Sequence, residues 1–188
     1  ANVLADLVLE WVAATLLVAR VARGFDEASA DRSAAHFSRI GVALAKYWCN
    51  KRLPAHVCEA LECHGGSGYV EESVMPRLYR QAPVNGIWEG SGNVICLDIL
   101  RSIERQPETL ETLFAELSLA QGNDRRFDLA VERLKDGLRR PAELQSGARR
   151  IVGAMAVALQ ASLLMRHGPT AAADAFCAAK PAGSRARL

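Results

Sequence analysis

The sequence is poor in aromatic residues, which make up 6% of its 188 positions, and it has almost no Val, Ile, Thr and Tyr runs of the kind that form strands. Half of the residues are hydrophobic, and alanine and leucine supply much of that share. This composition favours packed helices over sheets. We therefore expect an all-α protein, long enough for one domain with a hydrophobic core and a small extension.

Paired cysteines are also missing. The sequence has five, Cys49, Cys58, Cys63, Cys96 and Cys177, and no C-x-x-C pair. An odd, scattered set argues against a disulfide framework and favours a reducing, cytoplasmic compartment. Cys63 and His64 have no second Cys/His pair at zinc-finger spacing, so we expect no metal site.

Strong charge and membrane-spanning runs are lacking as well. The net charge of +2 is too small to indicate nucleic acid or a membrane surface by itself. The longest apolar stretches, 11–19 and 151–165, are bounded by charge and shorter than a bilayer requires. The chain does not open with a secretory signal pattern. We expect a soluble protein with no membrane partner.

Helical spacing of apolar residues, with Gly and Pro at the breaks, predicts the elements of the first part of the chain. A first helix is expected over residues 2–23, with Gly24 as its stop. Its apolar residues are expected roughly on one side: Leu4, Leu7, Val8, Trp11, Thr15, Val18 and Val21. We expect further helices over 29–62 with a bend near Pro54, over 76–81, and from about 89 to 105.

The second part is expected to be helical too. Pro107 lies in the first turn of a new helix, Asp124 caps one that runs through Leu138, and Pro141 opens a long helix to about His167. A short helix follows residue 168. The segments 1–106 and 107–188 are expected to be a helical bundle and an extra helical subdomain.

Two glycine-rich turns stand out, HGGSGY at 64–69 and EGSGN at 89–93. Open backbone N–H groups in such turns bind phosphate, although the glycines could equally form a helix stop and a tight turn. Tyr69 and Asn93 break the G-x-S-x-G pattern of serine hydrolases. The G-x-G-x-x-G pattern also fails and no strand precedes either turn, which excludes a Rossmann site.

Glu89 has two interpretations. As an acid at a helix start it gains a few tenths of a kcal/mol to about 1 kcal/mol from the helix dipole. As a general base it would have its pKa raised by apolar neighbours, here Ile87, Trp88 and Val94. Taken alone, these residues favour the structural interpretation.

The segment ECHGGSGYVEESVMPRLYRQAPVNGIWEGSGNVICLDILR at 62–101 changes that balance. It resembles the C-terminal motif of the acyl-CoA dehydrogenase family, in which a pattern close to Q-x-x-G-G-x-G-[YF] is followed by P-x-x-R-x-x-R-D and I-Y-E-G-T-x-x-I-Q. The spacing matches without insertion. The resemblance implies the helical bundle of that family's C-terminal domain.

The resemblance also implies roles for individual residues. Glu89 would be the catalytic base, which takes a proton from the α-carbon of an acyl-CoA thioester while the β-carbon gives hydride to flavin adenine dinucleotide (FAD). Trp88 and Gly90 would contact the substrate. The implied cofactor-binding residues are Ser91 and Asn93 and, toward the neighbouring subunit's FAD, Glu62, Gly65, Gly66 and Gly68.

Several positions depart from the family pattern. Glu62 replaces the usual glutamine, so a carboxylate that would repel phosphate unless screened or protonated stands where an amide donor is usual. Trp88 replaces the usual tyrosine and narrows the pocket. The chain also continues for about eighty residues beyond LDILR, and with QGNDRRFDLAVERLKDGLRRPAEL it resembles the DNA-alkylation-response branch of the family, which retains flavin and binds duplex DNA.

The family's N-terminal helical domain and middle β-domain would precede residue 1. We therefore expect a fragment that is inactive alone and belongs to a homotetramer, a dimer of dimers.

A basic segment supplies the candidate DNA-binding residues. Residues 121–150 contain eight basic and five acidic side chains. The candidates are Arg126, Arg133 and Arg140, spaced by seven, together with Arg149 and Arg150. They could equally form a solvated helix face with intrahelical ion pairs. The leading hypothesis is thus an enzyme module, the alternative is a DNA-binding protective protein with a vestigial flavin site, and the third is a purely structural bundle.

Overall fold

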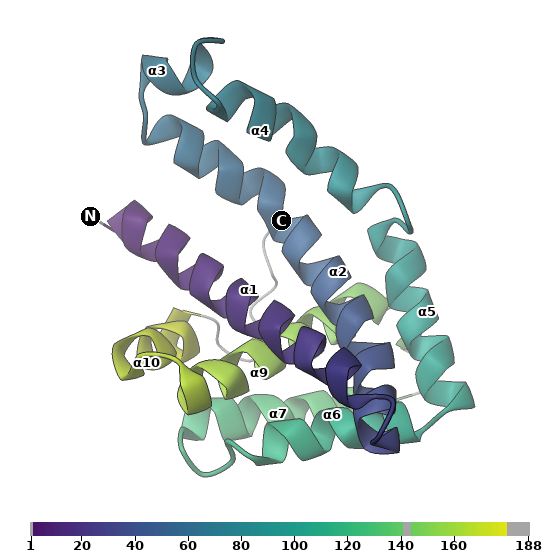
Figure 1. Cartoon of the computed structure of the whole chain (residues 1–188). Coiled ribbons are helices and arrows are strands. Elements are labelled where there is room, and N and C mark those ends of the chain that lie inside the picture. The colour runs from purple at the N-terminus through teal and green to yellow at the C-terminus, as the bar shows by residue number, and fades with distance from the viewer. Residues whose placement is uncertain (1, 141–143, 180–188) are drawn as a thin grey trace.

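The computed structural model describes residues 2–140 and 144–179, and in these ranges every regular element is a helix. The helices are α1 (Asn2–Glu27), α2 (Arg32–Glu62), α3 (Gly66–Tyr69), α4 (Met75–Gln81), the 3-10 helix η1 (Ala82–Gly86), α5 (Gly92–Arg105), α6 (Glu108–Ser118), α7 (Arg125–Leu138), α9 (Ala148–His167) and α10 (Thr170–Ala179). The all-α prediction is confirmed (Figure 1).

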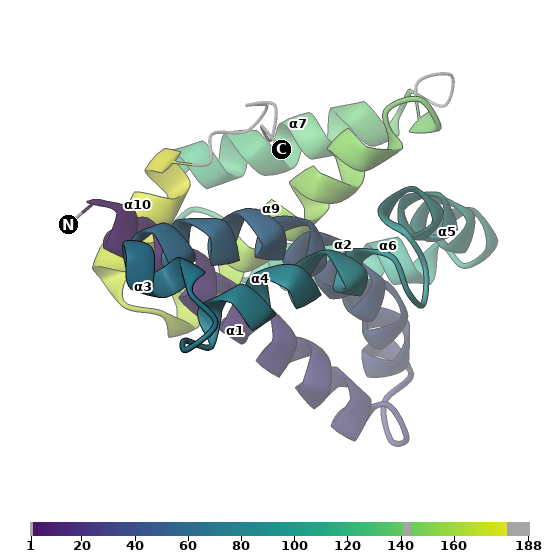
Figure 2. The same ribbon diagram turned by 90° about the horizontal axis from the view of Figure 1, so that it is seen from above.

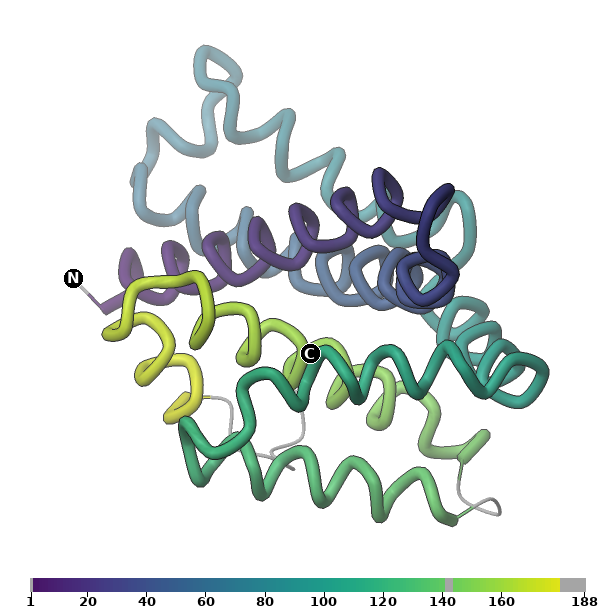
Figure 3. The backbone as a smooth tube through the Cα atoms, turned by 60° about the horizontal axis from the view of Figure 1, so that its bottom comes forward, coloured from purple at the N-terminus to yellow at the C-terminus, as the bar shows by residue number. Residues whose placement is uncertain are grey.

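Helix α9 is the centre of the packing. It contacts α1, α2, α5, α6, α7 and α10, and residues around most of its circumference are buried, including Met155, Leu159 and Leu163. Figure 3 shows the C-terminal helices on one side of the α1–α2 pair. One hydrophobic core includes residues from both segments of the chain. The subdomain boundary near residue 106 stays a prediction, and the two segments share this core.

Most helix ends follow from local residues. Asp31 caps α2 by accepting from the Ser33 backbone N–H, and Asp124 caps α7 by accepting from the N–H groups of Arg126 and Phe127. Helix α2 continues through Pro54 to Glu62. The helix predicted from Pro141 is wrong in its start, because α9 begins at Ala148; Pro141 itself lies outside the described residues.

Gly24 does not end the first helix, which continues to Glu27. A Cβ at this position would lie 2.7 Å from the Ser38 hydroxyl oxygen and 3.3 Å from the Phe37 ring. Glycine is needed here because α1 and α2 approach closely. A glycine inside a helix keeps its backbone hydrogen bonds, so it does not have to end the helix. The prediction of a stop is wrong for this reason.

Helix α1 turns a face of small and medium side chains, Ala13, Leu17 and Val21, toward α2 and the core. The prediction that Val21 shares a side with Leu4 and Trp11 is wrong, because Val21 packs beside Gly41 of α2. The larger apolar residues of the predicted stripe lie on its exposed side: Leu4, Val8, Trp11 and Val18 are all more than half exposed.

Both α1 and α9 are long and apolar enough to cross a bilayer, judged by length and composition alone. The apolar runs in the sequence had been judged too short for this. Helix α9, however, is mostly buried inside this fold.

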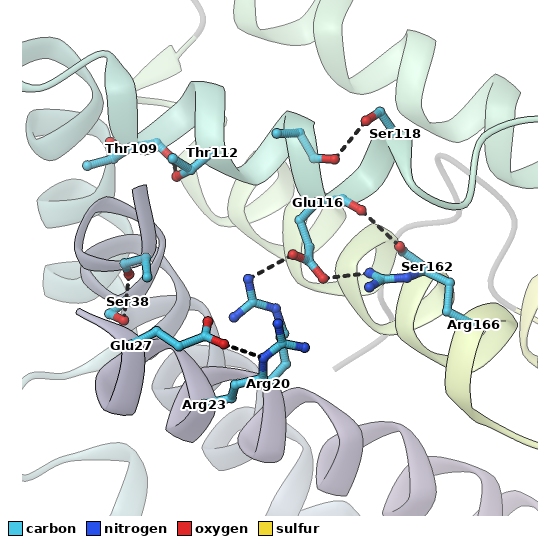
Figure 4. Close-up of polar contacts among 12 residues, drawn as sticks. Arg20, Arg23, Glu27, Ser38, Thr109, Thr112, Glu116, Ser118, Ser162 and Arg166 are labelled. Atoms are coloured by element: carbon cyan, nitrogen blue, oxygen red, sulfur yellow. Dashed lines mark hydrogen bonds and ion pairs between the residues drawn. The ribbon is translucent and has the colours of Figure 1, made fainter. Parts of the chain in front are cut away.

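A buried ionic cluster joins three helices across the core (Figure 4). The Glu116 carboxylate of α6 accepts from Arg20 of α1 and from Arg166 of α9. The Ser162 hydroxyl of α9 donates to the Glu116 backbone carbonyl, and the Arg20 guanidinium lies 3.9 Å from the centre of the Phe37 ring. Burial alone would raise the pKa of Glu116, but the hydrogen bonds from both arginines outweigh it and hold that pKa below its usual value.

Candidate active site

The turn around Glu89 is the most unusual backbone of the described chain. Glu89 is the one described residue other than glycine with a positive φ, 54°, and Gly90 follows with a φ of 110°. A left-handed conformation costs a side-chain-bearing residue about 1–2 kcal/mol. Such strain is often found at functional sites. Ser91 then returns to extended backbone and α5 begins at Gly92.

The sequence predicted that Glu89 lies in the first turn of a helix, and this prediction is wrong. Helix α5 starts three residues later. The stabilisation expected for an acid at a helix start does not explain the position of this carboxylate. The structural interpretation of Glu89 is thereby weakened.

The turn is attached to α2 on both sides. Toward α5, Gly92 is buried, and a Cβ there would lie 2.8 Å from Lys51 Cε and 3.4 Å from the Tyr47 ring. Toward η1, the Lys46 ammonium donates to the backbone carbonyls of Asn85 and Trp88. This role of Lys46 could not be predicted from the sequence, because its partners lie 39 and 42 positions away and no local motif marks it.

The surroundings of Glu89 are apolar but exposed. Ile87 is 67% exposed, Trp88 59% and Val94 56%, and Glu89 itself lies at the surface. The apolar enclosure expected around the carboxylate is not provided by these residues, because they point to solvent together with it. Ile87, Trp88 and Val94 form an exposed apolar surface around the Glu89 carboxylate.

The predicted FAD contacts next to Glu89 are accessible. Ser91 and Asn93 are both exposed, and the Ser91 side chain makes no capping hydrogen bond although Ser91 is the N-cap of α5. A serine at an N-cap usually satisfies a backbone N–H of its helix. The Ser91 hydroxyl accepts no such capping hydrogen bond from α5.

The three glycines of the HGGSGY turn serve two purposes. Gly65 has a φ of 58°, and a Cβ at Gly65 or at Gly66 would meet nothing within 4 Å. Gly68 is buried, and a Cβ there would lie 2.2 Å from the Leu61 carbonyl oxygen. Gly68 thus allows α3 to pack on the end of α2, whereas the backbone at Gly65 and Gly66 is open to a ligand.

The two glycine turns lie apart in this chain. Figures 1 and 2 show α3 and the start of α5 at opposite ends of the segment formed by α4 and η1. Glu62, which is exposed at the end of α2, lies with the first turn. The predicted site residues therefore form two separate groups, as they would if each group served a different cofactor molecule.

Of the predicted DNA-binding arginines, Arg126 and Arg133 are on α7, Arg149 and Arg150 are at the start of α9, and Arg140 follows the end of α7, so none is on the helix that follows Glu89. Arg126 is held by the carboxylates of Asp124 and Asp174. Arg149 lies half-buried beside Tyr47, where it counteracts the effect of burial, which raises the pKa of that phenol. Arg133, Arg140 and Arg150 are exposed.

Carboxylates on α7 pair with neighbouring basic residues three positions away, Glu132 with Lys135 and Asp136 with Arg139. These intrahelical pairs are of the kind expected for a solvated helix face.

Residues 1–104, more than half of the chain, match the family described as "Acyl-CoA dehydrogenase, C-terminal domain". The chain belongs to the acyl-CoA dehydrogenase family, and the resemblance predicted from the sequence is confirmed. It is similar to "Putative acyl-CoA dehydrogenase AidB" of Escherichia coli (strain K12), with 45% identity over 142 residues, 76% of this chain and 26% of that protein. Because 142 aligned residues exceed the first 106, the similarity extends into the C-terminal helices.

Two further matches come from Caenorhabditis elegans. "Acyl-CoA dehydrogenase family member 11" is 30% identical over 138 residues, 72% of this chain and 22% of that protein. The crystal structure of ACDH-11 in complex with C11-CoA superposes with a TM-score of 0.85 at 24% identity, over 98% of this chain and 36% of that one. This likeness shows the fold, including the C-terminal helices. The chain spans about a quarter of the length of these curated relatives.

Proposed function

We propose that this chain is the C-terminal helical part of a longer FAD-dependent acyl-CoA dehydrogenase, an oxidoreductase in which Glu89 is the catalytic base. Family membership supports the reaction class. The observation that supports Glu89 most directly is its left-handed backbone at the surface of the turn before α5. That conformation is not needed to start a helix, so a functional constraint is the better explanation of its cost.

Glu89 would act by accepting a proton at a carboxylate oxygen from the carbon next to the thioester carbonyl. The exposed apolar side chains of Val84, Ile87 and Trp88 give an acyl chain a surface to lie on. Covered by the substrate and by the remaining domains, the same side chains would remove water from around the carboxylate. A carboxylate with less water around it is a stronger base.

The residues present fit FAD in two places. No neighbouring atom blocks the approach of a diphosphate to the backbone at Gly65 and Gly66, although the Gly65 N–H donates to the Glu62 carbonyl. The uncapped hydroxyl of Ser91 and the exposed amide of Asn93 are hydrogen-bonding groups beside Glu89. When bound, FAD accepts the hydride from the β-carbon of the substrate.

The test uses the full-length flavoprotein with an acyl-CoA that reduces its flavin. Glu89→Gln should bind flavin normally and lower the rate of flavin reduction by about a hundredfold or more, the scale of general base catalysis. Glu72→Gln removes a carboxylate from another exposed position on the segment between the two turns and should leave the rate unchanged. An unchanged rate in Glu89→Gln would refute the assignment.

The second candidate is binding of duplex DNA, as in the alkylation-response branch, with dehydrogenation retained or the flavin site vestigial. The exposure of Arg133, Arg140 and Arg150 favours it. Arg126 is exposed as well and pairs with the carboxylates of Asp124 and Asp174. Such contacts would reach phosphates and not base edges, since no recognition-helix pattern is present.

Neutralising Arg133 and Arg140 to Gln should then weaken DNA binding about equally on unrelated sequences. The slope of log affinity against log salt should fall by about one unit per lost phosphate contact. Arg77→Gln with Arg101→Gln removes the same charge from exposed sites on α4 and α5 and is the matched control. Equal losses in both pairs, or a loss on one DNA sequence alone, would refute a phosphate-binding surface formed by Arg133 of α7 and by Arg140 just after that helix.

A further inference from the structure

Lys46 links the middle of α2 to the turn that carries Glu89. Its Nζ donates to the Asn85 carbonyl oxygen at 2.6 Å and to the Trp88 carbonyl oxygen at 2.9 Å. An ammonium group has three donors and no acceptor, so two of its three hydrogen bonds go to this segment. Both are charge-assisted, which makes them shorter and stronger than bonds between neutral groups.

One of the two carbonyls lies near the end of the 3-10 helix η1, and the other belongs to the peptide that precedes Glu89. Asn85 is in the last turn of η1, where carbonyls lack partners within the helix and the helix dipole is negative. The Trp88 carbonyl belongs to the same planar peptide unit as the Glu89 nitrogen. Holding that carbonyl fixes the plane from which the φ of Glu89 is measured, the φ that is positive in this structure.

The local backbone bonds of the turn do not fix this plane. The N–H groups of Ile87 and Trp88 both donate to the Val84 carbonyl, at 2.9 and 3.2 Å, and so close the end of η1. Beyond Glu89, the close approach of Gly92 to Tyr47 and Lys51 fixes the start of α5. Lys46 acts between these two attachments, at the peptide that precedes Glu89.

We infer that Lys46 is a positioning residue for Glu89: it holds the Trp88–Glu89 peptide so that Glu89 keeps its left-handed backbone and its carboxylate stays in place for proton transfer. This inference rests on the proposed role of Glu89. Lys46 does not touch the substrate in this role and acts only through the turn. The contact joins α2, which has a large share of the core, to an exposed segment that has few buried side chains.

The experiment compares Lys46→Met, which keeps most of the apolar stem and removes the donors, with Lys46→Arg, which restores a cationic donor. Lys51→Met makes the same chemical change five positions along α2 and keeps a stem beside Gly92. All are made in the full-length flavoprotein next to Glu89→Gln. The measurements are hydrogen–deuterium exchange of the peptide covering residues 84–90, kcat and KM, and the flavin content.

In Lys46→Met both hydrogen bonds are lost, and we expect faster exchange in residues 84–90. We expect kcat to fall about tenfold, the scale of one charge-assisted hydrogen bond, because only the bond to the Trp88 carbonyl holds the peptide that precedes Glu89. KM and flavin content should change little, because the substrate and cofactor contacts remain. Lys46→Arg should recover most of both losses, and Lys51→Met should match the parent. A merely structural role would lower stability in Lys46→Met without separating kcat from KM and without rescue by arginine.

Parent-like exchange and kcat in Lys46→Met, with Glu89→Gln still slow, would overturn the inference about Lys46 alone. A parent-like rate in Glu89→Gln would overturn the proposed function instead. If Lys46→Met fails to fold, Lys46→Arg decides the matter: a kcat and an exchange rate close to the parent support the inference, and a kcat as low as that of Glu89→Gln contradicts it.

Discussion

The Arg20 guanidinium of α1 lies 2.8 Å from the Glu116 carboxylate of α6, with side-chain exposures of 14% and 7%. This contact connects the part of the chain that matches the family domain to the helices beyond it. Arg166 of α9 adds a second cation to the same carboxylate. The C-terminal helices are thus fixed to the bundle by a buried ionic cluster as well as by the shared core.

Glu116→Gln should lower the free energy of unfolding by about 3 kcal/mol, because it leaves two largely buried guanidinium groups without their shared counter-charge. Urea denaturation monitored by circular dichroism measures the change. Glu111→Gln, on the exposed side of the same helix, is the control and should cost at most about 1 kcal/mol, the limit of a helix-dipole contribution. Equal losses in both variants would contradict a special role for the cluster.

The same cluster predicts how stability depends on pH. The pKa of Glu116 is lowered in the fold, so its contribution is complete above the usual value of 4.5 and is lost as pH falls through the lower folded value. The difference in unfolding free energy between the parent and Glu116→Gln should therefore be constant near neutral pH and shrink below about pH 4.5. A difference that grows on acidification would show that the sign is wrong.

Two neighbouring glycines offer a matched test of the HGGSGY turn. Gly68→Ala should displace α3 from α2 and cost about 1–3 kcal/mol, because the new methyl group would overlap the Leu61 carbonyl. Gly66→Ala meets no atom within 4 Å and should stay within about 0.5 kcal/mol of the parent. Amide exchange over residues 64–70, together with thermal unfolding, measures both effects. Equal behaviour of the two variants would contradict the division of roles in this turn.

The exposed side of α1 predicts self-association of this chain. Leu4, Val8, Trp11, Val18 and Phe25 repeat at helical spacing and are each more than half exposed. A surface of this kind is usually covered by another protein surface. We expect sedimentation to show species larger than the 20.3 kDa chain, and Val8→Lys with Trp11→Lys to return it to that mass. Leu129→Lys, an exposed leucine on α7, is the control; a monomeric parent at high concentration would contradict the prediction.

Local sequence rules predicted the helices well where local contacts decide. Asp124 caps α7 as expected, and Pro76 lies in the first turn of α4. The rules failed where a distant contact decides. Residue 24 is a glycine because α1 passes close to Ser38 of α2 and not because its helix ends there. The partners of Arg126 include Asp174, 48 positions away.

In the candidate site, too, some features could be predicted from the sequence and others depend on distant contacts. The resemblance to a family predicted which residues form the site, since the residues alone favoured a structural role for Glu89. The left-handed backbone of Glu89 and its attachment through Lys46 could not be predicted, because no short motif encodes a hydrogen bond between α2 and a turn about forty positions later. The exposure of Trp88 and Ile87 was also missed, since an apolar segment can lie in a core or face another domain.

The proposed function depends on one step, the removal by Glu89 of a proton from the α-carbon of an acyl-CoA. Its most direct measurement is the exchange of deuterium from the α-carbon of a labelled acyl-CoA into water, followed by mass spectrometry with the full-length flavoprotein. We predict that the parent and Glu72→Gln release the label and that Glu89→Gln retains it, with a rate lower by about a hundredfold. Release of the label by Glu89→Gln at the parent rate would contradict the account.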